Sequence, residues 1–166
     1  MKRLIIITIL LWVTGQMSAQ PGWKLTPYMQ QTGMLLSSDR ITSSGYGSGL
    51  GVALSKGHFL AQTDVNLLWT NGNAASNRFA VGIKGKGVWS PALLGTFATN
   101  WGDRTEILSE TGQRPPSAVW VAGVRIAPLR FEKEKGYLSA LEFGYGVGRD
   151  NARSLEISLV TIGINF

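Results

Sequence analysis

The sequence predicts an all-β fold, an eight-stranded antiparallel up-and-down β-barrel, and three observations support this class. Eight segments alternate apolar residues with small or polar ones at a period of two, the pattern of a β-strand with two different faces. The chain contains 21 Gly residues and regular turn signals, which disfavour a helical protein. The links between the segments alternate between longer and shorter ones, as in a meander whose two ends differ.

The first residues of the chain have the composition of a secretory signal peptide. Lys2 and Arg3 precede an apolar run, 4–13, interrupted only by Thr8, and small residues follow it. The run is too short to cross a bilayer as a helix, which takes about 20 apolar residues. We therefore expect export by the Sec route, with residues 1–19 as the signal peptide and residues 20–166 as a single barrel domain.

The predicted strands are defined by their alternation and span residues 22–30, 45–54, 58–70, 78–86, 88–101, 118–127, 137–148 and 155–166. In the third segment, Val65 and Leu67 share the apolar face, and Asp64 and Asn66 lie on the opposite face. The fifth segment is the least regular, because Pro91 weakens the strand pattern near its start.

The lengths of the links give the predicted barrel two different ends. The longer links are 31–44, 71–77, 102–117 and 149–154, and the shorter ones are 55–57, 87 and 128–136. Alternate links of a meander lie at the same end, so one end is expected to carry the long loops and the other mostly tight turns. An even strand count puts both termini at the tight-turn end. This asymmetry is typical of barrels that span an outer membrane.

The composition of the two faces favours a membrane barrel over a soluble one. One face collects large apolar and aromatic residues, and the other collects Gly, Ala and polar or charged residues. The interior of an eight-stranded barrel holds side chains and little else, too little room for all the aromatic rings. We therefore expect the apolar face to contact lipid. The alternative is a soluble lipocalin-like barrel, in which the apolar face points inward and binds an apolar ligand.

Two groups of side chains follow from this arrangement. Aromatic residues near the strand ends predict girdles at the two membrane interfaces, made by Trp23, Trp69, Trp89, Trp101, Trp120 and Tyr137. Charged residues on the inward face need partners in a narrow lumen. We expect a polar network that joins Asp64 and Glu142 to Arg125 and Lys84 and fills the barrel. A narrow pore for ions or small solutes through this network is an alternative.

The final segment, LEISLVTIGINF, ends in the aromatic Phe166, with Ile164 and Ile162 at alternate positions before it. With the signal peptide and the eight alternating strands, it resembles the small porin-like outer-membrane barrels of the OmpA/OmpX type. The resemblance implies an outer-membrane location in a Gram-negative bacterium and contact with outer-membrane lipids and lipopolysaccharide. It also implies that the barrel-assembly machinery recognises these three residues. That family often has Gly five residues before the end, where this chain has Thr161.

The sequence offers little support for catalysis, metal binding or nucleic-acid binding. The single histidine, His58, has Ser55 nearby but no carboxylate close in sequence to orient it, so a lipid-A-modifying enzyme is the least favoured alternative. Cys residues and His metal motifs are absent from the sequence, so we expect no metal and no cofactor. The formal charge of +6 comes from scattered Lys and Arg residues, and we expect no nucleic-acid partner.

The expected function is therefore non-enzymatic. We expect a monomeric outer-membrane barrel with a structural, adhesion or surface-interaction role. Loops 31–44 and 102–117 are the candidate sites for a surface partner, because barrel scaffolds carry their specificity on loops.

Overall fold

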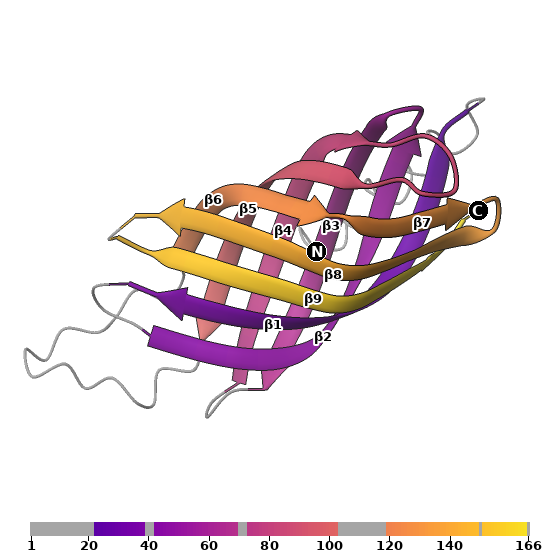
Figure 1. The fold of residues 1–166 in the computed structure, drawn as a ribbon. Helices are drawn as coiled ribbons and strands as arrows, with labels where there is room; N and C mark the ends of the chain where they lie inside the picture. The colour runs from indigo at the N-terminus through magenta and orange to yellow at the C-terminus, as the bar shows by residue number, and fades with distance from the viewer. Residues whose placement is uncertain (1–21, 39–41, 70–72, 103–118, 150, 166) are drawn as a thin grey trace, which may run out of the picture.

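The computed structural model describes residues 22–38, 42–69, 73–102, 119–149 and 151–165. Strands dominate these residues (Figure 1): β1 (Lys24–Ser37), β2 (Thr42–Lys56), β3 (Phe59–Trp69), β4 (Asn73–Lys84), β5 (Ala92–Gly102), β6 (Val119–Ala127), β7 (Leu129–Lys133), β8 (Gly136–Gly148) and β9 (Arg153–Ile164). Within the same ranges, no helix is long and apolar enough to cross a membrane.

The strands form one antiparallel sheet that closes on itself. Neighbours in the sheet follow the order β6-β5-β4-β3-β2-β1-β9-β8-β7, and an additional pairing joins β6 to β8. β6 and β7 both pair with β8 and are separated at Pro128, which cannot donate to a strand ladder. They are two parts of one barrel strand. The predicted fold, a closed eight-stranded antiparallel barrel, is confirmed.

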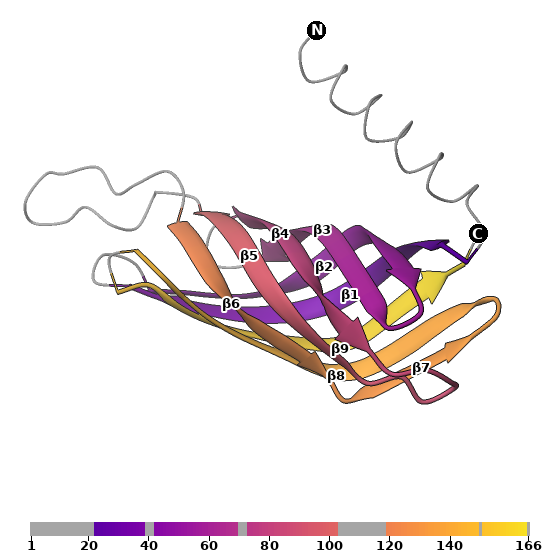
Figure 2. The same cartoon turned by 90° about the horizontal axis from the view of Figure 1, so that it is seen from above.

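The two ends of the barrel are distinguished by which strand ends they contain. The start of β1 and the end of β9 lie at one end, together with the β2–β3 turn and the β7–β8 turn (Figure 2). We call this the termini end. The opposite end, which we call the far end, contains the paired residues Ser37 and Thr42.

The predicted division into long and short links is correct for some links and wrong for others. The predicted links 102–117, 149–154 and 55–57 lie at the breaks between strands as expected, because β5 ends at Gly102, β8 at Gly148 and β2 at Lys56. Residues 31–44 are not a loop, because β1 continues to Ser37 and β2 begins at Thr42. Likewise β4 begins at Asn73, inside the predicted link 71–77. Conversely, the link between β4 and β5 runs over 85–91 at the termini end, where a single residue was predicted.

Strand pairing explains why β1 is longer than the sequence pattern indicated. Its second half has small or polar residues at outward positions, such as Gln31 and Gly33, so apolar alternation is weak there. This half is nevertheless hydrogen-bonded on both sides, to β2 and to β9. Of the two loops proposed for a surface partner, 31–44 is therefore mostly strand, and 102–117 lies almost wholly outside the described residues.

Every strand contributes large apolar side chains to the outer surface of the barrel. Its most exposed large side chains include Leu50 (70% exposed) and Ile83 (63%), and comparable residues project outward from the other strands. The inward face carries polar and charged residues, among them Asp64 and Arg78, each 2% exposed. The distribution has the polarity predicted for a barrel surrounded by lipid, and the opposite of a soluble ligand-binding barrel.

One predicted girdle residue, Tyr137, instead points into the lumen and is 4% exposed. The reason is an irregularity in β8 at Leu141, whose φ of 52° interrupts the extended backbone. Inward positions are odd-numbered before it and even-numbered after it, so Tyr137 and Glu142 both face inward. A similar shift near Leu159 alters the alternation of β9, because the pairing with β1 changes register there.

Candidate functional site

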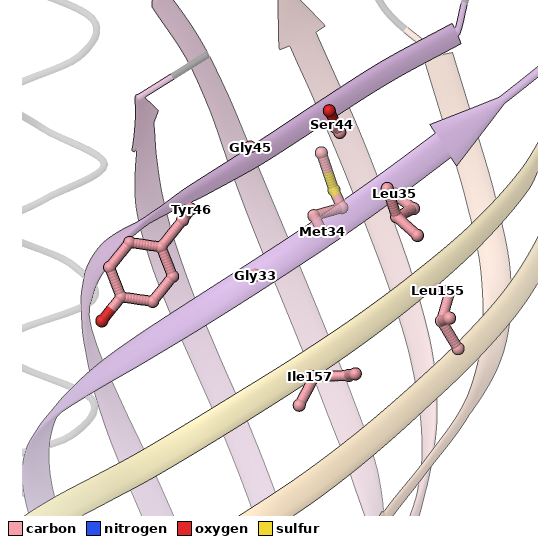
Figure 3. A pocket seen from close by; sticks show the side chains of 8 residues that line it. All are labelled: Gly33, Met34, Leu35, Ser44, Gly45, Tyr46, Leu155 and Ile157. Carbon is pink, nitrogen blue, oxygen red and sulfur yellow. The ribbon is translucent and has the colours of Figure 1, made fainter.

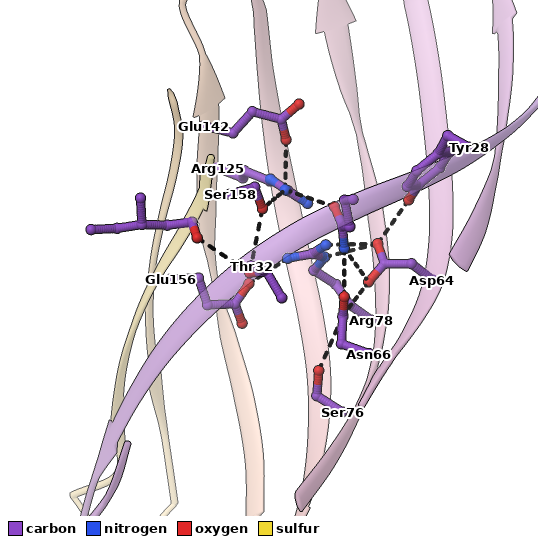
Figure 4. Close-up of polar contacts among 12 residues, drawn as sticks. Tyr28, Thr32, Asp64, Asn66, Ser76, Arg78, Arg125, Glu142, Glu156 and Ser158 are labelled. Atoms are coloured by element: carbon purple, nitrogen blue, oxygen red, sulfur yellow. Dashed lines mark hydrogen bonds and ion pairs between the residues drawn. The ribbon is translucent and has the colours of Figure 1, made fainter. Parts of the chain in front are cut away.

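A network of polar and charged side chains fills the middle of the lumen (Figure 4). We call it the central network, and its members are Tyr28, Gln30, Asp64, Asn66, Arg78, Arg125, Glu142, Glu156 and Ser158. All except Glu156 are buried, and they come from β1, β3, β4, β6, β8 and β9. The network therefore links strands around the whole barrel.

Asp64 accepts hydrogen bonds from four side chains. Arg78 donates to Oδ2 from Nε (3.1 Å) and Nη2 (2.7 Å), and Tyr28 Oη donates to the same oxygen at 2.8 Å. Gln30 Nε2 (3.2 Å) and Asn66 Nδ2 (2.6 Å) donate to Oδ1. Both oxygens of this buried carboxylate are thus compensated, as a charge out of water requires.

Arg78 lies between two carboxylates. Besides Asp64, it contacts Glu156 through Nη1, and the arginine side chain is 2% exposed against 1% for Asp64 and 13% for Glu156. Arg78 and Asp64 occupy opposite positions in the β3–β4 register, so two inward residues on adjacent strands meet directly. One guanidinium bridges strands β3 and β9 across the lumen.

Arg125 forms the second ion pair of the central network. Its Nη2 lies 2.6 Å from Glu142 Oε2, and it also donates to Ser158 Oγ at 2.5 Å and to Gln30 Oε1 at 3.1 Å. Gln30 donates to Asp64 with its other amide atom. This one amide therefore joins the Arg125 pair to the Asp64 pair.

The four residues proposed for the lumen network all have inward side chains, but their pairing differs from the prediction. Arg125 and Glu142 are brought together. Asp64 is paired with Arg78, which was not proposed although the alternation of its strand placed it on the polar face. Lys84 contacts neither proposed carboxylate. Alternation gave the face of each residue, whereas the partner depends on register between strands.

Lys84 belongs to a second cluster nearer the termini end, which we call the mouth cluster. Glu132 lies at its centre, with Lys84 Nζ at 2.7 Å, Arg130 Nη2 at 3.5 Å and Lys24 Nζ at 3.7 Å. The guanidinium of Arg130 also lies 3.6 Å from the ring centroid of Tyr137, a cation–π contact. Three cations therefore surround one carboxylate.

Two glycines of the segment GYGSGLG leave the space that the central network occupies. A Cβ at Gly51 would lie 2.4 Å from Tyr28 Cζ, and one at Gly49 would lie 2.0 Å from Asn66 Oδ1. Both distances are far below van der Waals contact. The alternating glycines of β2 are thus a lumen-facing stripe that accommodates larger side chains from β1 and β3.

The structure places His58 and Ser55, the two residues considered for lipid-A chemistry, in different surroundings. His58 is exposed in the β2–β3 turn, where its Nδ1 lies 3.0 Å from the carbonyl oxygen of Lys84. Ser55 points to the other side of the barrel wall and is 5% exposed. In the ranges that the structure covers, no group of three His, Asp or Glu side chains is placed to hold a metal ion.

The proposed girdle residues lie at both ends of the barrel. Trp69 and Trp120 are exposed at the far end, and Trp89 is exposed at the termini end, where its Nε1 donates to the carbonyl of Pro128 at 3.0 Å. Trp23 is half-buried at the termini end. The side chain of Trp101 lies outside the described residues.

The proposed assembly signal lies on the strand that closes the barrel against β1. Ile162 and Ile164 are exposed on the outer face of β9, and Phe166 lies outside the described residues. Asn165 anchors the end of this strand, because its Nδ2 donates to the carbonyls of Lys133 and Glu134.

The outer surface also contains an apolar hollow of about 400 Å³ where β9, β1 and β2 meet towards the far end (Figure 3). Gly33 and Gly45 form part of its lining, together with Met34, Leu35, Ser44, Tyr46, Leu155 and Ile157. Tyr46 Oη donates to Gln31 Oε1 at 2.8 Å beside it. The hollow lies on the apolar outer surface, and on the inner side of the wall Met34 and Leu36 belong to a cluster of buried apolar side chains.

Comparison with known proteins identifies the fold. No protein-family model matches the chain, and no match was found among curated proteins. The chain is similar in structure to Neisserial surface protein A, with a TM-score of 0.60 and 12% identity over 87% of this chain and 97% of that one.

It also matches two structures of Ail, the attachment invasion locus protein of Yersinia pestis. One, in complex with the heparin analogue sucrose octasulfate, has a TM-score of 0.46, 10% identity and coverage of 87% of this chain and 99% of that one. The other has a TM-score of 0.48, 10% identity and coverage of 86% and 98%.

Closed eight-stranded topology, an apolar outer surface and a charge-filled lumen occur together in this chain, and its structure superimposes on Neisserial surface protein A over most of both chains. The chain has the fold of the small eight-stranded outer-membrane barrels of the OmpA/OmpX type.

Proposed function

We propose that this chain is a monomeric integral barrel of the outer membrane of a Gram-negative bacterium, inserted by the barrel-assembly machinery after loss of its signal peptide. Its role is non-enzymatic, in envelope structure or in contact with a surface partner. The observation that carries the proposal is the polarity of the barrel: large apolar side chains cover the outside, and paired charges fill the inside. A lipid surrounding makes this distribution favourable, because it removes the apolar outer side chains from water.

The filled lumen supports a role exerted through the surface of the barrel. Asp64, Arg78, Arg125 and Glu142 are each 3% exposed or less, and they close ion pairs across the interior. Such a network restricts the passage of solutes through the lumen and stiffens the barrel wall. Other molecules would therefore contact the rims and the lipid-facing side of the barrel. Lipopolysaccharide would be the neighbour at the far end if that end faces outward, because exposed Arg149 and Arg153 lie there.

Fractionation tests the location. The full chain is expressed in a Gram-negative host, outer membranes are isolated, and a mild detergent extract is run on a denaturing gel with and without boiling. We expect recovery in the outer membrane and a mobility that changes on heating, because closed membrane barrels resist the detergent until heated. Recovery in the soluble periplasm without such a change would contradict the proposal.

Single cysteines test which face contacts lipid, because the chain has no cysteine of its own. Leu50→Cys places a thiol on the apolar outer surface, and His58→Cys places one in an exposed turn at the termini end. In reconstituted vesicles opened to both sides, a water-soluble maleimide should label His58→Cys and leave Leu50→Cys unlabelled. Equal labelling of both would mean that the outer surface contacts water.

A further inference from the structure

Every lysine in the described part of the chain lies at the termini end of the barrel. The positions are Lys24, Lys56, Lys84, Lys86, Lys133 and Lys135, at strand ends or in the adjoining turns. The exposed arginines Arg149 and Arg153 lie at the opposite, far end. The two ends of the barrel therefore present different cations, and the termini end concentrates the long, flexible ones.

These lysines divide into two inner and four outer ones. Lys24 and Lys84 contact Glu132 in the mouth cluster. The outer four are exposed, and within the described residues none has a carboxylate within ion-pair distance. We call these four the lysine rim: Lys56, Lys86, Lys133 and Lys135.

The charge at this end is not balanced from within the described chain. Glu132 is already occupied by three cations, which leaves Glu134 as the exposed carboxylate beside the rim. The rim lysines come from three different turns, so they surround the barrel mouth and do not form a single cluster. Such an arrangement suits several separate anions distributed around the barrel.

Aromatic side chains lie directly beside the rim on the outer surface. Lys56 Nζ lies 5.4 Å from the ring centroid of Trp23, which packs edge-on against Phe59 at 5.9 Å. Trp89 and Phe131 are exposed on the same end and are joined by a β-bridge. Aromatic rings of this kind occupy the boundary between hydrocarbon and headgroups, so the neighbouring ammonium groups reach the level of the lipid phosphates.

We propose that the lysine rim binds the headgroup phosphates of anionic phospholipids in the leaflet that surrounds the termini end. The inference rests on the proposed membrane location and adds the lipid class. A lysine has a long apolar stem and a compact charge, which lets it follow the outer surface and place its ammonium group at the phosphates. Each rim lysine contributes an electrostatic preference for an anionic over a zwitterionic headgroup.

The experiment measures lipid preference in the folded barrel. The barrel is reconstituted into vesicles of phosphatidylcholine with phosphatidylglycerol in equal amounts, and folding is verified by the heat-dependent gel shift. Spin-labelled lipids then report the relative association of each headgroup with the barrel. We expect phosphatidylglycerol to be preferred over phosphatidylcholine by about five-fold, the ratio that one lysine near a membrane surface supports. Added salt should reduce this preference, because it screens the charges.

Three variants locate the preference. Replacing all four rim lysines by Gln should abolish it, whereas replacing the same four by Arg keeps the charge and should retain most of it. Arg149→Gln with Arg153→Gln removes charges from the far end and should leave it intact. None of these six side chains contributes to the central network, so the barrel should still show its heat-dependent shift in each variant.

The outcomes separate this inference from the proposed function. A heat-dependent shift without a preference for phosphatidylglycerol would overturn the lipid inference and leave the membrane barrel standing. A preference that survives the Lys→Gln changes, or that disappears with the arginine pair, would also overturn it. Absence of a folded barrel in vesicles for the unaltered chain would overturn both.

Discussion

Replacement of Asp64 by Asn tests whether the centre of the barrel excludes water. The carboxylate receives donors on both oxygens: Gln30 and Asn66 on Oδ1, and Tyr28 and Arg78 on Oδ2. The amide keeps the shape but turns one acceptor into a donor. Whichever way it is oriented, its NH₂ group faces two donating side chains, and the negative charge is lost.

The magnitude follows from burial and from the partner that remains. Asp64 and Arg78 have side-chain exposures of 1% and 2%, so this is a desolvated pair. Removing one member of such a pair typically costs about 3–5 kcal/mol of folding free energy. Arg78 keeps its contact with Glu156, so we expect a value near the lower limit, about 3 kcal/mol.

Urea unfolding of the reconstituted barrel, followed by tryptophan fluorescence and by the gel shift, measures this cost. With a slope of about 2 kcal/mol per molar urea, the midpoint should fall by about 1.5 M. Glu134→Gln is the matched control, because it removes the same charge from an exposed position and should change the stability by less than about 0.5 kcal/mol. A cost of Asp64→Asn below about 1 kcal/mol, the size found for exposed pairs, would show that water enters the network and would favour a conducting lumen.

Three further predictions concern the wall of the barrel. Gly51→Ala should lower the free energy of unfolding by about 1–3 kcal/mol, because its Cβ would lie 2.4 Å from a lumen tyrosine ring. Gly95→Ala should be tolerated, because the nearest atom to its Cβ would lie 3.7 Å away. Equal urea midpoints for Gly51→Ala and Gly95→Ala would contradict the packing argument. In vesicles, Leu50→Arg should lower the free energy of unfolding by about 2–4 kcal/mol, because it places a charge against lipid. Ile164→Arg, at a strand end, should lower it by only about 0–1 kcal/mol. No loss of stability in Leu50→Arg would indicate that this surface contacts water. Tyr137→Phe keeps the ring beside the Arg130 guanidinium and removes a hydroxyl that has no hydrogen-bond partner among the described residues, so the urea midpoint should not change. Tyr137→Leu removes the ring and should lower the free energy of unfolding by about 0.5–2 kcal/mol.

The outward and inward faces could be predicted over most of the chain because alternation is a local property. Val65 and Leu67 face outward on β3 and Asp64 and Asn66 face inward, as their positions in the sequence indicate. The irregularity at Leu141 could not be anticipated in the same way. A single residue outside the extended conformation reverses every later side chain of a strand, and no composition signal marked it.

The extents of the strands also depended on more than local pattern. Residues 31–37 lack a clear apolar alternation, yet they form strand because β2 and β9 supply hydrogen-bonding partners on both sides. Several link lengths estimated from the pattern were consequently wrong, although the class that they supported is correct. The polarity of the two faces was the sounder observation, since it depends on many residues and on no single boundary.

The amino-acid sequence by itself determined the all-β class, the number of barrel strands and the polarity of the wall, because these follow from the period-two distribution of apolar residues. Only the tertiary structure decided which charges meet in the lumen. Asp64 meets Arg78, and Glu142 meets Arg125, through the register of neighbouring strands and the reach of side chains across the barrel. The gathering of the lysines at one end likewise became visible only once the strands had directions. Closure of the sheet brings distant residues into contact, and this geometry is not encoded in any one segment of the chain.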